Sequence, residues 1–440
     1  MGFIQGEGRT QGALFPVVLD DLVPCDHVCR VIDAFVTRLE MSQLGFERSE
    51  PAETGRPGYD PRDLLKLYLY GYLQQIRSSR RLEAECRRNV EVMWLLGRLA
   101  PDYKSIAEFR RIHREAVTEA GAELVRFARS VGLVRGEWVA IDGSKFLAVS
   151  SARSVREREA MERYLDAVET ADGQEEVVID PSAVAHALEK LNRHLEPEAH
   201  FMRVGHGHAP AYNVQTAVDA EHALIVAQKV TGEATDNRSL LPMAEAAQEA
   251  VGKPAPLNVV ADAGYSNGEQ AEACETKGIL PHVPANRAIN NQGDGTLFDR
   301  TAFHYDAATD TFQCPAGQPL TRKQLQRSKN RVAYTAPAET CGACPLKDRC
   351  TGSPQRFVHR HLYEGALERM QQPAAMRLRR STVERPFGTL KYRIFAYPRF
   401  LLRGLGGAQT EISLGSMAYN LKRMMKVLGG SRLTQAMASA

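Results

Sequence analysis

Two hydrophobic periodicities divide the chain into a helical beginning and a longer part built from strands and helices. Asp60-Pro61 has the form of a helix N-cap followed by proline at the first helical position. Apolar side chains follow it at helical spacing, at Leu64, Leu65, Tyr68, Leu69 and Tyr72. Ser105-x-x-Glu108 has the spacing of a capping box and predicts the start of a second helix. We therefore predict an all-helical N-terminal domain over residues 1–130.

From residue 137 onward the pattern changes to short β-prone runs. Three strands in succession, then alternating helices and strands, indicate a mixed α/β sheet flanked by helices. A charged helical segment at 151–205 and a cysteine-bearing segment at 286–372 interrupt this order. We predict strands at 138–149, 212–218, 224–230, 257–261 and 279–283, and helices at 155–167, 182–194, 239–250 and 268–276, with 212–218 and 224–230 joined as a hairpin.

Composition describes an ordinary globular protein, with 43% hydrophobic and 25% charged residues in 440 positions. That length is enough for two or three domains. No uninterrupted apolar run is long enough to span a bilayer. The first ten residues also lack the basic-then-apolar form of a signal peptide. We therefore expect a cytoplasmic protein with no membrane partner.

Positive charge is concentrated in two places, although the net charge is only +3. Between residues 377 and 403 there are eight Arg or Lys and a single acid, Glu384. Such a field attracts a polyanion, and the acid within it can hold a cation. The N-terminal helices carry a second group, which is either a solvated helix face or a DNA-binding surface; its members include Arg77, Arg80, Arg81, Arg87, Arg88, Arg110, Arg111 and Arg114.

Three carboxylates are the candidates for catalysis. Asp142 lies within a β-prone run, where its Asp-Gly pair is either a hairpin corner or part of a continuous strand. Asp262 follows an apolar strand and is either an N-cap or a group at the ligand-binding end of a sheet. Glu384 shares a helical face with Arg380 and Lys391, although Pro386 is expected to kink or restart that helix. Converging carboxylates can hold two Mg²⁺ ions for phosphodiester chemistry.

Four late cysteines have the spacing of a metal site. Cys314 opens a Cys-Pro-Ala-Gly turn after a predicted hairpin at residues 303–314, and Cys341, Cys344 and Cys350 follow. A tetrahedral Zn²⁺ site fits these ligands in an intracellular protein. The alternatives are unrelated thiols or a redox pair, with His359 and His361 as possible substitute ligands. Cys25, Cys29, Cys86 and Cys274 are interpreted as ordinary core thiols.

Several motifs, in this order along the chain, resemble the DDE transposases of bacterial insertion sequences. The likeness is closest to the branch with a helical N-terminal domain and a four-cysteine insertion. It covers roughly residues 10–430 and is far more specific than any single motif. The stretches that carry it are Gly55-Arg-Pro-Gly-Tyr-Asp-Pro61, Ala140-Ile-Asp-Gly-Ser-Lys145, Tyr212-Asn-Val-Gln-Thr-Ala-Val-Asp219, Ala261-Asp-Ala-Gly-Tyr265 and Thr382-Val-Glu-Arg-Pro-Phe-Gly388.

The resemblance implies a ribonuclease-H-like catalytic core over residues 134–285, with the helical insertion at 151–205 inside it. Asp142 would lie on its first strand and Asp262 on its fourth. A cysteine-rich, zinc-binding insertion would occupy residues 286–372, and 373–430 would supply the helix that carries Glu384. Related transposases have a Tyr-x₂-Arg-x₃-Glu-x₆-Lys signature, of which Arg380, Glu384 and Lys391 are present, whereas Arg377 occupies the tyrosine position.

The implied activity is metal-dependent cleavage of double-stranded DNA at the element's terminal inverted repeats, followed by strand transfer into target DNA. Asp142, Asp262 and Glu384 would bind Mg²⁺ or Mn²⁺, and the protein would act as a homo-oligomer on DNA near the bacterial nucleoid. Arg377, Arg379, Arg380, Lys391 and Arg393 would contact the DNA backbone, and Arg80, Arg81, Arg110 and Arg111 would recognise the element's ends. Two alternatives stay open: a metal-dependent endonuclease or resolvase without strand transfer, and a catalytically inactive zinc-containing DNA-binding protein.

Overall fold

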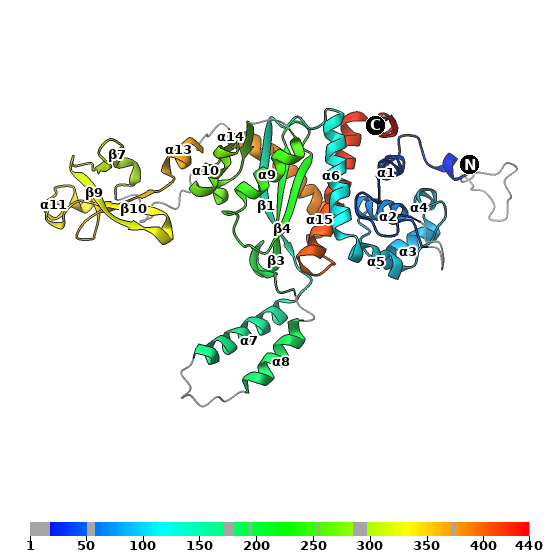
Figure 1. Ribbon diagram of the computed structural model, residues 1–440, viewed down its shortest axis with the longest axis horizontal. Coiled ribbons are helices and arrows are strands. Elements are labelled where there is room, and N and C mark those ends of the chain that lie inside the picture. The colour runs from blue at the N-terminus through cyan, green and yellow to red at the C-terminus, as the bar shows by residue number, and fades with distance from the viewer. Residues whose placement is uncertain are drawn as a thin grey trace, which may run out of the picture. The chain divides into compact units, whose positions relative to one another are not determined.

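The computed structural model describes residues 18–50, 58–170, 180–192, 196–252, 256–284, 297–370 and 375–439 (Figure 1). The chain folds into two compact units made of interleaved segments. The first contains Met1–Arg135, Gly143–Ala234 and Thr382–Ala440, and the second contains Gly136–Asp142 and Thr235–Ser381. Residues 55–57 of the first family-like motif and the end of the helix predicted at 182–194 lie outside the described residues. The predicted domain limits stay predictions.

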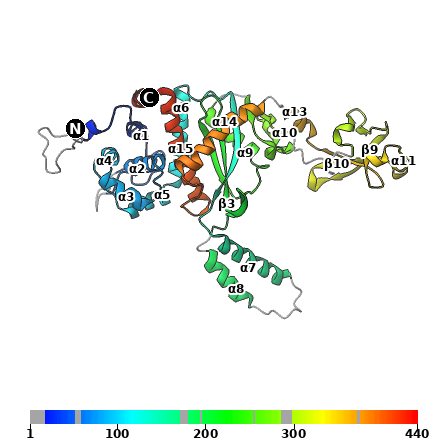
Figure 2. The same ribbon diagram turned by 180° about the vertical axis from the view of Figure 1, so that it is seen from behind.

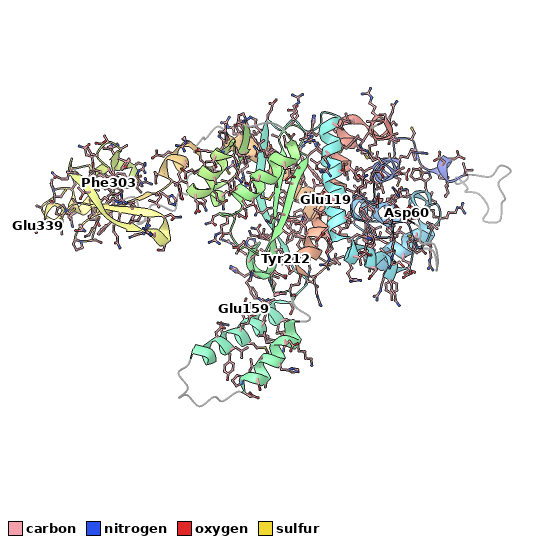
Figure 3. All side chains as sticks on the ribbon, in the orientation of Figure 1. Asp60, Glu119, Glu159, Tyr212, Phe303 and Glu339 are labelled. Atoms are coloured by element: carbon pink, nitrogen blue, oxygen red, sulfur yellow. The ribbon has the colours of Figure 1, made fainter. Side chains whose placement is uncertain are left out.

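The first unit begins with the predicted helices. Asp60 caps α2, since its carboxylate accepts a hydrogen bond of 2.8 Å from the Arg62 backbone N–H (Figure 3). The predicted capping box at Ser105 is wrong, because Asp102 caps α5 and accepts from the N–H groups of Lys104 and Ser105. The elements are η1 (Leu19–Leu22), α1 (Val28–Thr37), α2 (Pro61–Leu73), α3 (Ser79–Arg88), α4 (Val90–Leu95), α5 (Tyr103–Ile112) and α6 (Arg114–Ser130).

A buried carboxylate joins these helices to α15 (Gly404–Leu428), which is followed by α16 (Gly430–Ser439). The side chain of Glu411 is fully buried. One of its oxygens accepts from Tyr72 at 3.2 Å and Arg77 at 3.0 Å, and the other accepts from two backbone N–H groups. Because each oxygen has donors, the charge is compensated. Figure 2 shows α15 running beside α6, against which it packs.

One sheet holds six strands in the order β2-β3-β1-β5-β6, with β4 paired to β3. β2 and β4 each pair antiparallel with β3, whereas β5 pairs parallel with both β1 and β6. The predicted hairpin is confirmed, and so is the strand that continues through Asp142. The bounds are β1 (Trp138–Leu147), β2 (His200–Val204), β3 (Gly207–Asp219), β4 (Ile225–Thr231), β5 (Leu257–Val260) and β6 (Ile279–His282), with α7 (Ala152–Thr170) and α8 (Pro181–Asn192) inserted between β1 and β2.

In the second unit β5 and β6 are accompanied by α9 (Leu240–Val251), η2 (Ala263–Tyr265) and α10 (Gly268–Thr276). The cysteine-bearing segment forms a separate five-stranded sheet in the order β11-β10-β9-β8-β7. Seven buried residues, Phe303 among them, give this segment a hydrophobic core of its own (Figure 3). The bounds are η4 (Arg300–Ala302), β7 (His304–Asp306), β8 (Thr311–Gln313), β9 (Pro319–Gln326), η5 (Arg327–Lys329), β10 (Arg331–Thr335), α11 (Ala338–Gly342), α12 (Lys347–Cys350), β11 (Phe357–His361) and α13 (Glu364–Met370).

Helix α14 (Ala375–Thr389) continues through Pro386, so the expected restart does not occur. Val383 and Phe387 of this helix, and Leu390 directly after it, are buried at positions i, i+4 and i+7, which leaves Glu384 on the exposed face. A π-helical segment, η6 (Leu390–Ile394), follows directly. No helix among the described ranges combines the length and apolarity needed to cross a membrane.

Candidate active site and metal-binding residues

Asp142 lies in the middle of β1, where the strand continues through the Asp-Gly pair. The hairpin corner that the sequence left open is therefore not formed. Val139, Ala140 and Ile141, just before it, are fully buried, while the Asp142 side chain is 18% exposed. The strand thus carries this carboxylate out of the core without placing it fully in solvent.

Asp262 follows β5 and caps η2, because its Oδ1 accepts a hydrogen bond of 2.8 Å from the Gly264 N–H. The N-cap interpretation is confirmed, and it leaves Oδ2 for another partner. In the parallel pair formed by β1 and β5, Ala140 stands opposite Val260. Asp142 and Asp262 each follow two residues later. Both aspartates therefore lie just beyond the paired residues of β1 and β5, at the edge of the sheet formed by the carboxyl end of this parallel pairing. This is the edge at which α/β proteins bind ligands.

Arg379 of α14 joins the two aspartates, and all three residues belong to the second unit. Its Nη2 lies 2.8 Å from Asp142 Oδ1 and 3.4 Å from Asp262 Oδ2. The arginine side chain is 16% exposed, so its charge is only partly screened by water. A single guanidinium nitrogen therefore balances both carboxylates.

Two further residues lie beside this pair, and sequence reasoning missed them. Tyr265 is fully buried, and burial together with the charges of Asp236, Asp142 and Asp262 raises the pKa of its hydroxyl. A Cβ added to Gly264 would lie 2.9 Å from Asp262 Oδ1 and 3.8 Å from Asp236 Oδ2, which places Asp236 close to Asp262. The only sequence signal for Asp236 is a Thr-Asp-Asn turn after β4. That signal indicates a turn and carries no chemistry.

The aspartate pair fits a divalent cation. Carboxylate oxygens are the hard ligands that Mg²⁺ and Mn²⁺ prefer. Asp142 and Asp262 each turn an oxygen toward one point, where a cationic nitrogen already lies. These two residues could therefore hold such an ion at the edge of the sheet.

Glu384 is an exposed residue of α14, five positions after Arg379. It belongs to the first unit, and the aspartates belong to the second. Of the predicted DNA-backbone residues, Arg377, Arg380 and Arg393 are exposed. The Lys391 ammonium lies 5.7 Å from the centre of the Phe146 ring. Arg379, by contrast, is engaged with the aspartates.

The N-terminal arginines divide into exposed and buried groups. Arg80 and Arg81 are exposed, and Arg111 is exposed but ion-paired with Glu108. Arg110 is only 4% exposed, and its guanidinium lies 4.7 Å from the centre of the Tyr68 ring. The expected DNA contact of Arg110 is therefore corrected: this residue packs inside the helical domain. The position of each arginine around its helix decides whether it is buried or exposed. The sequence did not distinguish these positions among neighbouring arginines.

The four late cysteines line one small cavity of about 30 Å³. The predicted hairpin formed by β7 and β8 delivers Cys314, whose backbone closes a turn with Gly317 and Gln318. All four thiols are free, and burial raises the pKa of Cys350. His361 accepts a hydrogen bond from the Tyr363 N–H and lies against Gly268. The cysteine cavity is lined instead by other residues, so His361 is no substitute ligand.

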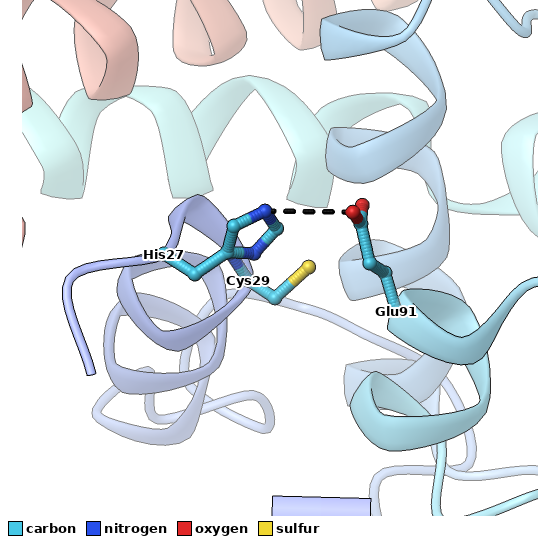
Figure 4. Close-up of side chains that lie close together, drawn as sticks. All are labelled: His27, Cys29 and Glu91. Carbon is cyan, nitrogen blue, oxygen red and sulfur yellow. Dashed lines mark hydrogen bonds and ion pairs between the residues drawn. The ribbon is translucent and has the colours of Figure 1, made fainter. Parts of the chain in front are cut away.

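A second group of potential ligands, His27, Cys29 and Glu91, lies in the N-terminal helices (Figure 4). Among the described residues it is the one set of three whose ligand atoms lie within 4.8 Å of one another. His27 Nδ1 accepts a hydrogen bond from the Cys29 N–H at 3.3 Å, so the ring proton is on Nε2, 3.5 Å from Glu91. Burial also raises the pKa of the Cys29 thiol to about 12. This group is therefore explained as the cap of α1.

Comparisons with known proteins identify the family. Residues 17–111 match a transposase domain of the DUF772 type, and residues 173–421 match the transposase DDE domain. The second match covers more than half of the chain, which therefore belongs to the DDE transposase family. No curated protein matches it. One similar solved structure is that of the piggyBac transposase synaptic complex with hairpin DNA, at 9% identity and a TM-score of 0.34, covering 93% of this chain and 78% of that one.

The family establishes the main expectations drawn from the sequence. The chain is a DNA transposase, an enzyme with a ribonuclease-H-like core that acts on DNA by divalent-metal catalysis. The sheet agrees with that core, since it combines the antiparallel pair of β3 and β4 with the parallel strands β1, β5 and β6. In chain order, Asp142 lies on the first of these strands, as the resemblance implied, whereas Asp262 follows the fourth strand instead of lying on it.

Proposed function

We propose that Asp142, Asp262 and Glu384 are the three catalytic carboxylates of this transposase and bind Mg²⁺ or Mn²⁺. The observation that supports this most is the convergence of Asp142 and Asp262 on one nitrogen of Arg379. Glu384 is the exposed acid of the helix that carries this arginine. The element's DNA would enter beside this edge of the sheet.

The proposed reaction cuts the DNA at the end of the element and joins the released 3′-hydroxyl to target DNA. Divalent cations bound to these carboxylates supply activation of the attacking oxygen and stabilisation of the leaving oxygen. The protein's part is to fix the carboxylates and to hold the scissile phosphate. Exposed Arg377, Arg380 and Arg393 carry the charge for that second task.

Recognition of the element's terminal inverted repeats is assigned to the N-terminal helices. Arg80 and Arg81 are exposed there and can contact phosphates, and Arg111 would do so after leaving its surface ion pair with Glu108. Because the two ends must be joined, we propose that the protein acts as a homo-oligomer on DNA. Its substrate would place it in the bacterial cytoplasm, at the nucleoid.

We further propose a structural Zn²⁺ bound by Cys314, Cys341, Cys344 and Cys350. The cavity that they share supports the site. The segment already has a hydrophobic core around Phe303, so the metal would add to the stabilisation that this burial supplies. Zinc would order the cysteine loops, and the cluster would hold the sheet.

The experiment compares Asp142→Asn, Asp262→Asn and Glu384→Gln with the wild-type protein on labelled duplexes that carry the terminal repeat. We expect each variant to bind the duplex and to lose cleavage in Mg²⁺, because a neutral amide is a weaker ligand. Glu40→Gln, at an exposed position in the loop after α1, is the control. Normal cleavage by any of the three variants would remove that residue from the mechanism.

A second assay separates transposition from simple nuclease activity. Duplexes already cut to expose the terminal 3′-hydroxyl are supplied with a target plasmid and Mg²⁺. Joined products are expected from the wild-type protein and from Glu40→Gln, and none from Asp142→Asn. Cleavage without any joining would favour an endonuclease or resolvase.

A further inference from the structure

The arginine between the two aspartates occupies the place that a divalent cation needs. Asp262 has two oxygens, and Oδ1 is engaged by the Gly264 N–H at 2.8 Å. The other, Oδ2, is the one that faces Arg379. A metal that binds Asp262 through Oδ2, the oxygen outside the cap, therefore competes with the arginine.

Charge makes this competition strong. Two carboxylates held at one sheet edge repel each other unless a cation lies between them. A guanidinium can donate to both, but it cannot stay beside a divalent cation without unfavourable repulsion. Because Arg379 and Asp142 are 16% and 18% exposed, water screens that repulsion only in part.

We propose that Arg379 is a built-in counter-ion of the aspartate pair, which it positions in the metal-free protein and must leave when a divalent cation binds. Once displaced, the guanidinium is on a helix whose exposed neighbours, Arg377 and Arg380, carry the charge proposed to contact DNA. Metal binding thereby frees one more cation for a phosphate. This inference rests on the proposed role of Asp142 and Asp262 as metal ligands.

The chain offers a close control. Arg380, the next residue on α14, carries the same charge but is exposed. Replacing it removes one positive charge from the same helix and leaves the contact with the aspartates in place. Any difference between variants at 379 and 380 therefore reports on that contact.

The test is calorimetric titration of the full-length, metal-stripped protein with MnCl₂ in the absence of DNA. Arg379→Gln is expected to bind Mn²⁺ more tightly than wild type, on the order of tenfold, since the competing charge is gone. Arg380→Gln is expected to stay within about twofold of wild type, because its charge is screened by solvent. Thermal unfolding gives a second readout. Without metal, the melting temperature of Arg379→Gln should be lower than that of wild type, and saturating Mn²⁺ should reduce this difference in melting temperature.

Unchanged Mn²⁺ affinity in folded Arg379→Gln would overturn the counter-ion role. If Arg379→Gln does not fold, Arg379→Lys replaces it, because one ammonium on a shorter stem holds both aspartates less well. A several-fold rise in affinity is expected for that variant, and wild-type affinity would refute the proposal. Asp142→Asn and Asp262→Asn distinguish a failure of the counter-ion role from a failure of the proposed metal site. If neither variant weakens Mn²⁺ binding, the proposed metal site itself is wrong.

Discussion

At the scale of single residues, the site depends on how each oxygen of Asp262 is used. Oδ1 holds the turn of η2 through the Gly264 N–H, and Oδ2 points toward the shared position with Asp142. The N-cap interpretation of Asp262 is therefore confirmed and uses one oxygen, while the proposed metal-binding role uses the other.

Gly264→Ala is expected to lower cleavage of the terminal repeat by about 10- to 100-fold, because small displacements of catalytic groups have effects of that size. The new Cβ would lie 2.9 Å from Asp262 Oδ1, so the carboxylate has to move. Gly207→Ala, where a Cβ meets no atom within 4 Å, is the control for cleavage rate. Equal rates for the two variants would contradict the prediction.

His113 predicts a pH dependence of stability. The residue is 5% exposed, and burial lowers its pKa from 6.5. In the unfolded chain it takes up a proton near pH 6.5, whereas in the folded protein it does so only at lower pH. The free energy of unfolding should therefore fall as the pH decreases from 7 through that window.

Urea unfolding at several pH values checks this, with His113→Leu as the comparison. The variant lacks the titrating group, so its stability should vary less between pH 7 and pH 5. Parallel pH profiles for the two proteins would show that His113 does not contribute.

At the scale of elements, the parallel strands, helix α14 and the cysteine segment have different roles. The parallel pair β1 and β5 brings two aspartates to one edge, and α14 supplies the charge that balances them. The cysteine segment has its own sheet and core, with Cys314, Cys341 and Cys350 packed against that core. Metal and hydrophobic burial are therefore expected to share the stabilisation of this segment.

Removal of zinc tests that division. Cys344→Ser, or treatment with a chelator, should release one Zn²⁺ per chain and increase proteolysis within residues 297–370, because metal binding is coupled to folding. The exposed thiol Cys25 supplies the control, since Cys25→Ser should keep the metal. Elemental analysis and limited proteolysis measure both effects. Wild-type protein purified without zinc would contradict the assignment.

At the scale of the whole molecule, the distribution of charge matters more than its sum. A net charge of +3 indicates no particular partner. The arginines predicted to contact DNA fall instead into three classes, which are buried in the helical domain (Arg110), paired with the aspartates (Arg379) or exposed (Arg377 and Arg393 among them). Only the exposed class is available to phosphates, each contact adding about 0.9 to the slope of log affinity against log salt.

The double variant Arg377→Gln with Arg393→Gln should therefore flatten the salt dependence of DNA binding by about 1.8 in slope. Fluorescence anisotropy over a salt series measures it. Lys426→Gln removes an exposed charge from the end of α15 and should leave the slope unchanged. A wild-type slope in the double variant would exclude both arginines from the DNA interface.

The sequence by itself missed β2 (His200–Val204), which falls in the segment predicted to be helical. It determined the other five strands of the large sheet, the hairpin of β3 and β4, and the three acids worth testing. These features are encoded locally, since an alternation of period two or a capping residue acts over a few positions. Motif order along the chain identified the family, because several spaced motifs together are specific where one is not.

Only the tertiary structure decided which polar groups meet. Arg379 reaches Asp142 across 237 positions and Asp262 across 117, and no local pattern encodes contacts at such separations. The burial of Arg110, the closeness of Asp236 to Asp262 and the shared cysteine cavity have the same origin. The sequence alone does not show whether a charged side chain faces water, an aromatic ring or a carboxylate. The packing of elements that are distant in the sequence decides which of these it contacts.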